Sequence, residues 1–311
     1  MLETISSVQK FNYSPIHRGI NAYKKRADLI TKVKTKPPSS SPSVLQSRCK
    51  SPDSSWLMMA HQQENTIGII GGLSAMATLT FLEKLEFWSS RNAEKHHVPF
   101  IVCSDPAIIR KNNNNIGLQQ QMIAENLLQK RLFLEESGAG CIVMPCHMSH
   151  LWYPHVSRGC SVPFLDVSEC VARELKEANL KPVEGGRSNV RIGVLAAADS
   201  PLLATFYHQK LHSQGLECIL ADKPTREHMV IPMMEALKQK DMEGARNLLR
   251  IAVQVLLVRG VNLVILAADE FQGLLPCDDP LLNKCIDPMD ALARSAIKWA
   301  LHKSKPIIIE Q

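Results

Sequence analysis

The chain has 311 residues, of which 45% are hydrophobic and 21% are charged. This balance is typical of a globular protein and excludes a chain that is disordered over most of its length. The length exceeds what one small core needs, so it favours one large domain or two linked ones. The formal net charge of +6 has to be interpreted from where the charges lie along the chain.

The excess positive charge lies in the first 60 residues. They hold ten lysines and arginines and three acidic residues, whereas the rest of the chain holds 26 basic and 27 acidic residues. The body therefore has no basic surplus to attract a nucleic acid, and we expect no nucleic-acid partner.

Residues 1–60 also contain eleven serines and show no sustained hydrophobic period. A basic, serine-rich and acid-poor leader is typical of an organelle transit peptide. The serine content favours the chloroplast (the plastid stroma) over the mitochondrion. The alternative is a disordered basic tail that carries no address.

Cysteine spacing and the uncharged runs bear on the environment of the body. The nine cysteines include no CxxC pair, which predicts reduced thiols rather than a disulfide framework. The longest uncharged run, Asn65–Leu82, is interrupted by glycine, serine and threonine, so we expect no membrane span.

From Thr66 onward, short apolar runs alternate with helical patterns, which predicts an α/β fold with parallel sheets. One amphipathic helix is expected to begin after Asp241 and to end before Gly260, and a last helix begins at Asp287-Pro288. In chain order, we expect buried strands at Thr66–Ile70, Phe100–Cys103, Cys141–Pro145, Arg191–Leu195, Glu217–Leu220 and Val261–Leu266.

The body divides into two halves of similar plan, because each opens with an apolar strand that contains Ile-Gly, at Ile67-Gly68 and at Ile192-Gly193. We expect an N-terminal α/β half over residues 66–180 and a C-terminal half over residues 190–286. Residues 287–311 would form a helix and tail that pack back on the body. Two such halves would place a ligand at their interface, where the carboxyl ends of strands meet.

Cys146 is the strongest local candidate for chemistry. It follows the predicted strand Cys141–Pro145, at the point where polar residues open the next helix. Backbone N–H groups at such a place favour the thiolate and so make a cysteine nucleophilic or basic. The alternatives are a small buried apolar residue and a metal site. The metal site would use Cys146, His147, His150, His155 and Cys160, whose spacing matches no standard zinc pattern.

The segment Gly71-Gly72-Leu73-Ser74 connects a predicted strand to a helix. A glycine turn of this kind exposes backbone N–H groups that can bind a carboxylate or a phosphate. The glycines do not follow the GxGxxG spacing, which argues against a nicotinamide cofactor.

Three segments in order resemble the aspartate/glutamate racemase family. Ile67–Gly72 followed by Met76–Thr78 is similar to the family's opening pattern, which is close to IGxxGGxGPxAT. Ser104–Ile108 resembles the exit of the family's second strand, and Met144–His150 resembles its MPCNTAH motif. The resemblance covers nearly all of the body and is closest to the plant, organelle-targeted branch.

The resemblance implies two pseudo-symmetric, three-layer α/β halves with the active site at their interface. It also implies racemisation of an acidic amino acid, interconverting L- and D-aspartate or glutamate, without metal, pyridoxal phosphate or other cofactor. In this family one cysteine from each half faces the substrate α-carbon, so that one removes a proton and the other delivers one to the opposite face. A homodimer is what the family suggests.

The resemblance assigns Cys146 to the first catalytic cysteine, with His147 in the place of an asparagine. The family's second motif, GCTE, would fall at positions 267–270, where Ala268 replaces its cysteine. Asp269 and Glu270 are then the candidates for the opposite-face acid or base. The substrate-binding candidates are Gly72, Leu73, Ser74, Arg110, Lys111, His147, Met148, Ser149, Lys238 and Ala268.

The replacement of the second cysteine leaves three functions open. The first is a racemase of acidic amino acids that uses Cys146 and a carboxylate or water. The second is a one-cysteine decarboxylase or isomerase of a small diacid, which needs proton transfer on one face only. The third is a binding protein for acidic amino acids that does no chemistry.

Overall fold

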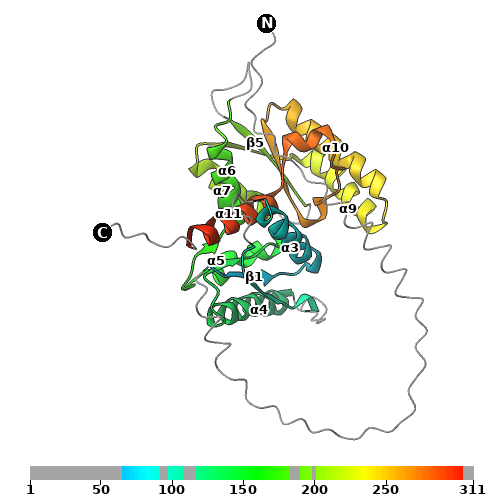
Figure 1. Cartoon of the computed structure of the whole chain (residues 1–311). Coiled ribbons are helices and arrows are strands. Elements are labelled where there is room, and N and C mark those ends of the chain that lie inside the picture. Colours follow the sequence, from blue (N-terminus) through cyan, green and yellow to red (C-terminus); the bar gives the residue numbers. More distant parts are fainter. Residues whose placement is uncertain (1–64, 92–96, 108–115, 182–189, 198–200, 304–311) are drawn as a thin grey trace, which may run out of the picture.

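The computed structural model describes residues 65–91, 97–107, 116–181, 190–197 and 201–303. Within these ranges the chain forms two separate four-stranded sheets with helices around them (Figure 1). None of the helices described is both long enough and apolar enough to cross a lipid bilayer. The predicted leader, residues 1–60, lies outside the described residues.

The N-terminal sheet is wholly parallel and has the strand order β2-β1-β3-β4. Its strands are β1 (Ile67–Gly71), β2 (Phe100–Ser104), β3 (Cys141–Val143) and β4 (Phe164–Leu165). The connecting helices are α3 (Ala75–Ser89), α4 (Ile116–Glu136), the 3-10 helix η2 (His147–Trp152), α5 (Tyr153–Val156) and α6 (Val167–Glu177).

The C-terminal sheet is also parallel and has the order β6-β5-β7-β8. Its strands are β5 (Arg191–Ala196), β6 (Glu217–Leu220), β7 (Leu263–Ala267) and β8 (Cys285–Ile286). The helices are α7 (Pro201–Ser213), α8 (Lys223–Thr225), the π-helix η3 (Arg226–Val230), α9 (Ile231–Lys238) and α10 (Met242–Val258), followed by η4 (Asp269–Phe271), η5 (Pro280–Lys284) and α11 (Pro288–Lys303).

The two halves repeat one plan, because in each sheet the first strand of the half lies between its second and third strands. The predicted fold class, two α/β halves with parallel sheets, is therefore confirmed. The expected strand Cys141–Pro145 was too long, since the paired residues run from Cys141 to Val143, and the expected strand Val261–Leu266 began and ended too early, since the observed strand runs from Leu263 to Ala267. The strands β4 and β8 were not predicted, because each is two residues long and so short a segment cannot show a periodic pattern.

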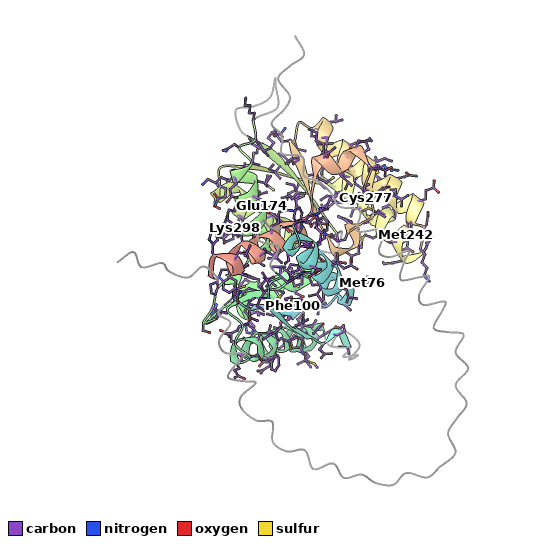
Figure 2. The ribbon with its side chains drawn as sticks, in the orientation of Figure 1. Met76, Phe100, Glu174, Met242, Cys277 and Lys298 are labelled. Carbon is purple, nitrogen blue, oxygen red and sulfur yellow. The ribbon has the colours of Figure 1, made fainter. Side chains whose placement is uncertain are left out.

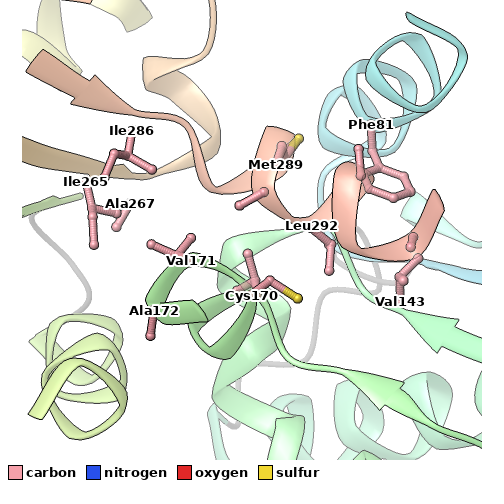
Figure 3. Packing of buried hydrophobic residues seen from close by; sticks show 14 of the residues in the cluster. Phe81, Val143, Cys170, Val171, Ala172, Ile265, Ala267, Ile286, Met289 and Leu292 are labelled. Carbon is pink, nitrogen blue, oxygen red and sulfur yellow. The ribbon is translucent and has the colours of Figure 1, made fainter. Parts of the chain in front are cut away.

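The largest apolar cluster lies between the two sheets (Figure 3). It combines Phe81 of α3, Val171 of α6 and Leu292 of α11 with strand residues of both halves, such as Val143 and Ile265. The helix α11, which follows the C-terminal sheet, packs on α3 and α6 of the N-terminal half. The helix α4 covers the other face of the N-terminal sheet, and α9 and α10 cover that of the C-terminal sheet (Figure 1). This packing fixes the two halves against each other.

Candidate active site

Cys146 lies just beyond the carboxyl end of β3, beside the turn that follows β1. The strands β1 and β3 are parallel neighbours, so their carboxyl ends lie at one edge of the sheet. The approach is close: a Cβ added at Gly72 would lie 2.4 Å from Cys146 Cβ and 2.3 Å from Ser149 Oγ. Real Cβ atoms do not come so near another heavy atom, so the second position of this turn needs glycine.

The glycine turn and the segment after Cys146 are joined by hydrogen bonds. The backbone N–H of Leu73 donates to Ser149 Oγ at 3.3 Å. Ser74 is the N-cap of α3, where its side chain accepts from the backbone N–H of Ala77 at 3.1 Å. The backbone N–H groups of Ser74 and Ser149 and the Ser149 hydroxyl face the Cys146 sulfur. The turn therefore presents the N–H group of Ser74 to the thiol, and the binding of a carboxylate or phosphate by the turn stays a prediction.

Asp269, a residue of the C-terminal half, also lies beside Cys146. It stands in η4, directly after β7, and its Oδ1 accepts from the backbone N–H of His147 at 3.1 Å. The same Oδ1 lies 2.7 Å from Nδ1 of the His147 ring. The Asp269 carboxylate also accepts from the Cys146 thiol. Residues 122 positions apart in the chain thus meet at the thiol, at the interface of the two halves.

The hydrogen bonds continue beyond His147. Its other ring nitrogen, Nε2, lies 3.3 Å from the hydroxyl of Tyr207 on α7. Both side chains are buried. Cys146, Asp269, His147 and Tyr207 therefore form one chain of groups that can carry protons.

The charges around Cys146 favour the thiol over the thiolate. Burial raises the pKa of Cys146 to about 11, and the negative charge of Asp269 acts in the same direction. The N–H groups of Ser149 and Ser74 oppose this rise and do not overcome it. The expectation of a thiolate favoured by its position at a helix start was thus wrong for the resting site, because burial and a carboxylate from the other half outweigh the N–H groups.

Asp269 has the opposite balance. Burial by itself raises the pKa of its carboxyl, but the hydrogen bonds from His147 and Cys146 outweigh that effect and hold the pKa below its ordinary value. At neutral pH the pair is therefore a thiol and a carboxylate.

A family model for "Asp/Glu/Hydantoin racemase" matches residues 70–296 of the chain. The chain belongs to this family.

Individual relatives in the same family are distant in sequence. The "Broad specificity amino-acid racemase RacX" of Bacillus subtilis is 21% identical over 179 residues, which are 56% of this chain and 71% of the relative. An aspartate racemase homologue from Pyrococcus horikoshii has a similar solved structure, with a TM-score of 0.61, 21% identity and coverage of 76% of this chain and 99% of the other. The aspartate racemase of Picrophilus torridus has a TM-score of 0.57 at 23% identity and covers 76% and 94%. The structures establish the shared fold, and membership of the family supports an isomerase that racemises an amino acid.

The structure separates the two carboxylates proposed for the opposite face. Asp269 is hydrogen-bonded to the Cys146 thiol, and its role at the opposite face of a substrate stays a prediction. Glu270 is exposed. Ala268, in the place of the family's second cysteine, is 3% exposed and belongs to the apolar cluster under α10. In the described residues, position 268 therefore offers no proton donor.

The other predicted substrate-binding residues are placed differently. Met148 is half-buried against the apolar cluster between the sheets. Lys238 ends α9 with its side chain largely exposed, where its Nζ lies 3.9 Å from Glu235 of the same helix. It is a surface residue and takes no part in the hydrogen bonds around Cys146, since the α9 side that carries it faces solvent. Arg110 and Lys111 lie outside the described residues.

His150 matches the family's last histidine and has a structural role. Its Nε2 lies 2.7 Å from the carbonyl oxygen of Met144, and its ring packs against Tyr153 and Phe206. Burial lowers the pKa of His150 to about 4, so the ring is neutral. Across the described ranges, no three histidine, cysteine or acidic side chains come together in a way that could hold a metal ion.

Sequence reasoning missed two residues of this region. Tyr207 gave no signal, because an aromatic residue in an amphipathic helix is usually part of a core. Lys130 lies in α4 and is only 5% exposed, with its Nζ 2.8 Å from the carbonyl oxygen of Gly71. A lysine in a helix is usually solvated, and only the packing of α4 on β1 shows that this one points inward.

Proposed function

We propose that this protein is a cofactor-independent racemase of acidic amino acids in which Cys146 exchanges the proton on the substrate α-carbon. The observation that carries the proposal is the meeting of the Cys146 thiol, the glycine turn and Asp269 at the interface of the two halves. Relatives named as aspartate racemases and a broad-specificity amino-acid racemase support the substrate class.

In the resting site Cys146 is an acid. With its pKa at about 11 the thiol can deliver a proton to one face of a carbanion, but it must ionise before it can remove a proton. An acidic amino acid brings one positive α-ammonium group and two carboxylates, and only the ammonium group favours the thiolate. A substrate bound with its ammonium group nearer to the sulfur than its carboxylates would therefore activate the base.

The hydrogen-bonded pair of Asp269 and His147 gives the departing proton a place to go. The thiol already donates to the Asp269 carboxylate, and the proton can pass from sulfur to this oxygen while the His147 ring stays bonded to it. The negative charge then moves from the carboxylate to the sulfur, and the number of protons in the site is unchanged. The backbone N–H groups of Ser74 and Ser149 stabilise that sulfur charge.

Proton exchange in deuterated water tests the proposal. L-aspartate and L-glutamate are incubated with the protein, and the chirality and α-deuterium of the recovered amino acids are measured. We expect the D-enantiomer with deuterium at the α-carbon. The variant Cys146→Ala should lose this activity by a factor of about a thousand or more, since it removes the group proposed to exchange the α-proton itself.

The matched control is Cys218→Ala, which removes a half-buried thiol from β6 in the C-terminal sheet. It should keep the activity of the unchanged protein. Full activity of Cys146→Ala would end the proposal, and so would the absence of both deuterium and D-enantiomer with either amino acid.

A second candidate is proton transfer on one face only, as in a decarboxylase or isomerase of a small diacid. The buried Ala268 favours it, because nothing at that position can protonate the opposite face. Deuterium in unchanged L-enantiomer would point to this reaction.

The variant Ala268→Cys discriminates between the two candidates. If the missing thiol limits inversion, the variant should raise the rate of D-enantiomer formation at least tenfold, as measured by chiral chromatography. No gain would mean that the opposite-face donor lies elsewhere or that the natural reaction does not invert the α-carbon.

A further inference from the structure

Lys130 is a buried lysine that the mechanism above does not use. It projects from α4, which covers the outer face of the N-terminal sheet, and it is 5% exposed. Its Nζ donates to the carbonyl oxygen of Gly71 at 2.8 Å. Burying an ammonium group costs free energy unless it gains hydrogen bonds and opposite charges. The position of Lys130 therefore calls for an explanation.

The hydrogen bond places the ammonium group at the base of the glycine turn. Gly71 is the last residue of β1, and the next residue, Gly72, is the one that lies against Cys146. Two residues further on, the N–H of Ser74 faces the Cys146 sulfur. Lys130 is thus hydrogen-bonded to the last carbonyl group of β1, directly before the turn.

The charges around Lys130 also connect this residue with Cys146. Burial lowers the pKa of Lys130, and the negative charges of Asp105, which follows β2, of Cys103 in β2 and of Cys146 oppose this effect. The facing strand β1 contributes a carbonyl. Around Cys146, the acidic neighbour is Asp269, which disfavours the thiolate. Cys146 is one of the groups that act on Lys130, and the positive charge of a lysine acts on a thiol in the sense opposite to that of Asp269.

We propose that Lys130 is a positioning residue for Cys146. Lys130 anchors the glycine turn against the thiol, and its positive charge offsets the negative charge of Asp269 and so favours the thiolate. The inference rests on the role given to Cys146 in the proposed function. Under this proposal α4 controls how readily the thiol ionises, although none of its described residues is given in contact with the thiol.

The test follows the ionisation of Cys146 directly. Thiolate absorbance at 240 nm is titrated in the full-length protein, and the curve of the same variant with Cys146→Ala is subtracted, so that the difference belongs to Cys146. Replacing Lys130 by methionine keeps the length of the side chain and removes both the charge and the hydrogen bond. We expect Lys130→Met to move the midpoint upward by about one pH unit, a roughly tenfold smaller thiolate fraction at a given pH.

Two further variants separate the charge from the hydrogen bond. Lys130→Arg keeps the charge and should titrate as the unchanged protein does. Lys130→Gln can still donate to Gly71 and should show part of the upward shift. If Lys130→Met does not fold, as judged by near-ultraviolet circular dichroism, the difference between the Arg and Gln variants decides the question.

The control for a general loss of one positive charge is Lys298→Met. Lys298 is an exposed residue of α11 whose Nζ lies 3.4 Å from Glu177, on the opposite side of the N-terminal sheet from α4 (Figure 2). The Lys298→Met variant should leave the midpoint of the Cys146 titration unchanged. A Lys130→Met midpoint equal to that of the unchanged protein, or equal midpoints for the Arg and Gln variants, would overturn the proposal.

The titration needs no substrate, so its result does not depend on whether the proposed function is correct. A shifted midpoint in a protein that exchanges no α-proton would leave the role of Lys130 intact and would contradict the racemase. Racemisation with an unshifted midpoint would do the reverse.

Discussion

At Gly72 the backbone passes so close to Cys146 that one added carbon atom has no room. The same approach lets the N–H of Ser74 reach the sulfur. Gly71 is confined as well, since an added Cβ would lie 2.2 Å from Ser104, whereas at Gly193 of β5 it would meet the side chains of Leu256 and Val264 at 3.3 Å. The atoms that a side chain at position 72 would meet belong to Cys146 and Ser149, so the requirement for glycine there belongs to the site.

The substitution Gly72→Ala tests this requirement. We expect a loss of about 1–3 kcal/mol in the free energy of unfolding, because the new Cβ overpacks the site. We also expect a loss of about a hundredfold in α-proton exchange, because Cys146 must move. Urea unfolding and deuterium incorporation measure the two effects. Gly193→Ala is the control, and an equal loss of exchange in both variants would contradict the explanation.

Asp269 predicts a pH dependence of stability. Its pKa in the folded protein is lowered, so the carboxylate stabilises the fold at pH values above its ordinary pKa of 3.8, and this contribution is lost as the pH falls through the folded-state value. The substitution Asp269→Asn removes this contribution. The difference in unfolding free energy between the two proteins should therefore shrink between pH 6 and pH 3, as measured by urea unfolding. A difference that is constant or grows toward acid pH would show that the pKa is not lowered.

At the scale of single elements, side chains at the helix starts satisfy the free backbone N–H groups. Asp166 caps α6 by accepting from the backbone N–H groups of Ser168 at 2.8 Å and Glu169 at 3.3 Å. Asp241 caps α10 by accepting from the N–H of Gly244 at 2.8 Å. The helix α10 is the one whose limits the sequence predicted best, since it runs from Met242 to Val258.

The cap of α10 can be removed without touching the site. The substitution Asp241→Ala should lower the free energy of unfolding by about 1 kcal/mol, since the N–H of Gly244 loses its partner. Proton exchange at the substrate α-carbon should stay unchanged, because α10 packs on the outer face of the C-terminal sheet. Thermal unfolding and the exchange assay check both expectations. A variant that folds well and yet loses exchange would show that α10 supports the site.

At the scale of the whole molecule, a buried ion network joins the two halves. Lys84 of α3 lies 2.7 Å from Asp287 and 3.0 Å from Asp290, at the start of α11. Trp88 of α3 donates from Nε1 to Asp290 at 2.8 Å. Further along α11, Arg294 binds Glu174 of α6 through two hydrogen bonds of 2.7 Å. The segment after the second sheet thereby fixes the interface at which the thiol and Asp269 meet.

Removing the cation from this network should destabilise the whole body. The substitution Lys84→Met leaves two buried carboxylates without their partner, and we expect a loss of about 3–5 kcal/mol in unfolding free energy. Both sheets should unfold together, as read from tryptophan fluorescence and far-ultraviolet circular dichroism. A loss below 1 kcal/mol would show that the network contributes little to the contact between the halves.

The strands and the plan of the fold were predictable because they depend on short-range patterns. Runs such as Ile67–Ile70 and Ile192–Leu195 are apolar throughout, which is what a strand buried on both faces requires. The ends of the strands were less certain, since pairing ends where the partner strand ends. Import into the chloroplast, and the leader that would direct it, stay predictions.

The sequence by itself determined that Cys146 follows one strand and that a glycine turn follows another, because each of these features is encoded within a few residues. Only the tertiary structure decided the chemistry around the thiol. It brought Asp269 into hydrogen-bond contact with His147 beside the thiol, placed the Tyr207 hydroxyl 3.3 Å from the His147 ring, and turned Lys130 inward under Gly71. These contacts join residues 59 to 122 positions apart. Burial and neighbouring charge set a pKa, and both arise only when the two halves pack together.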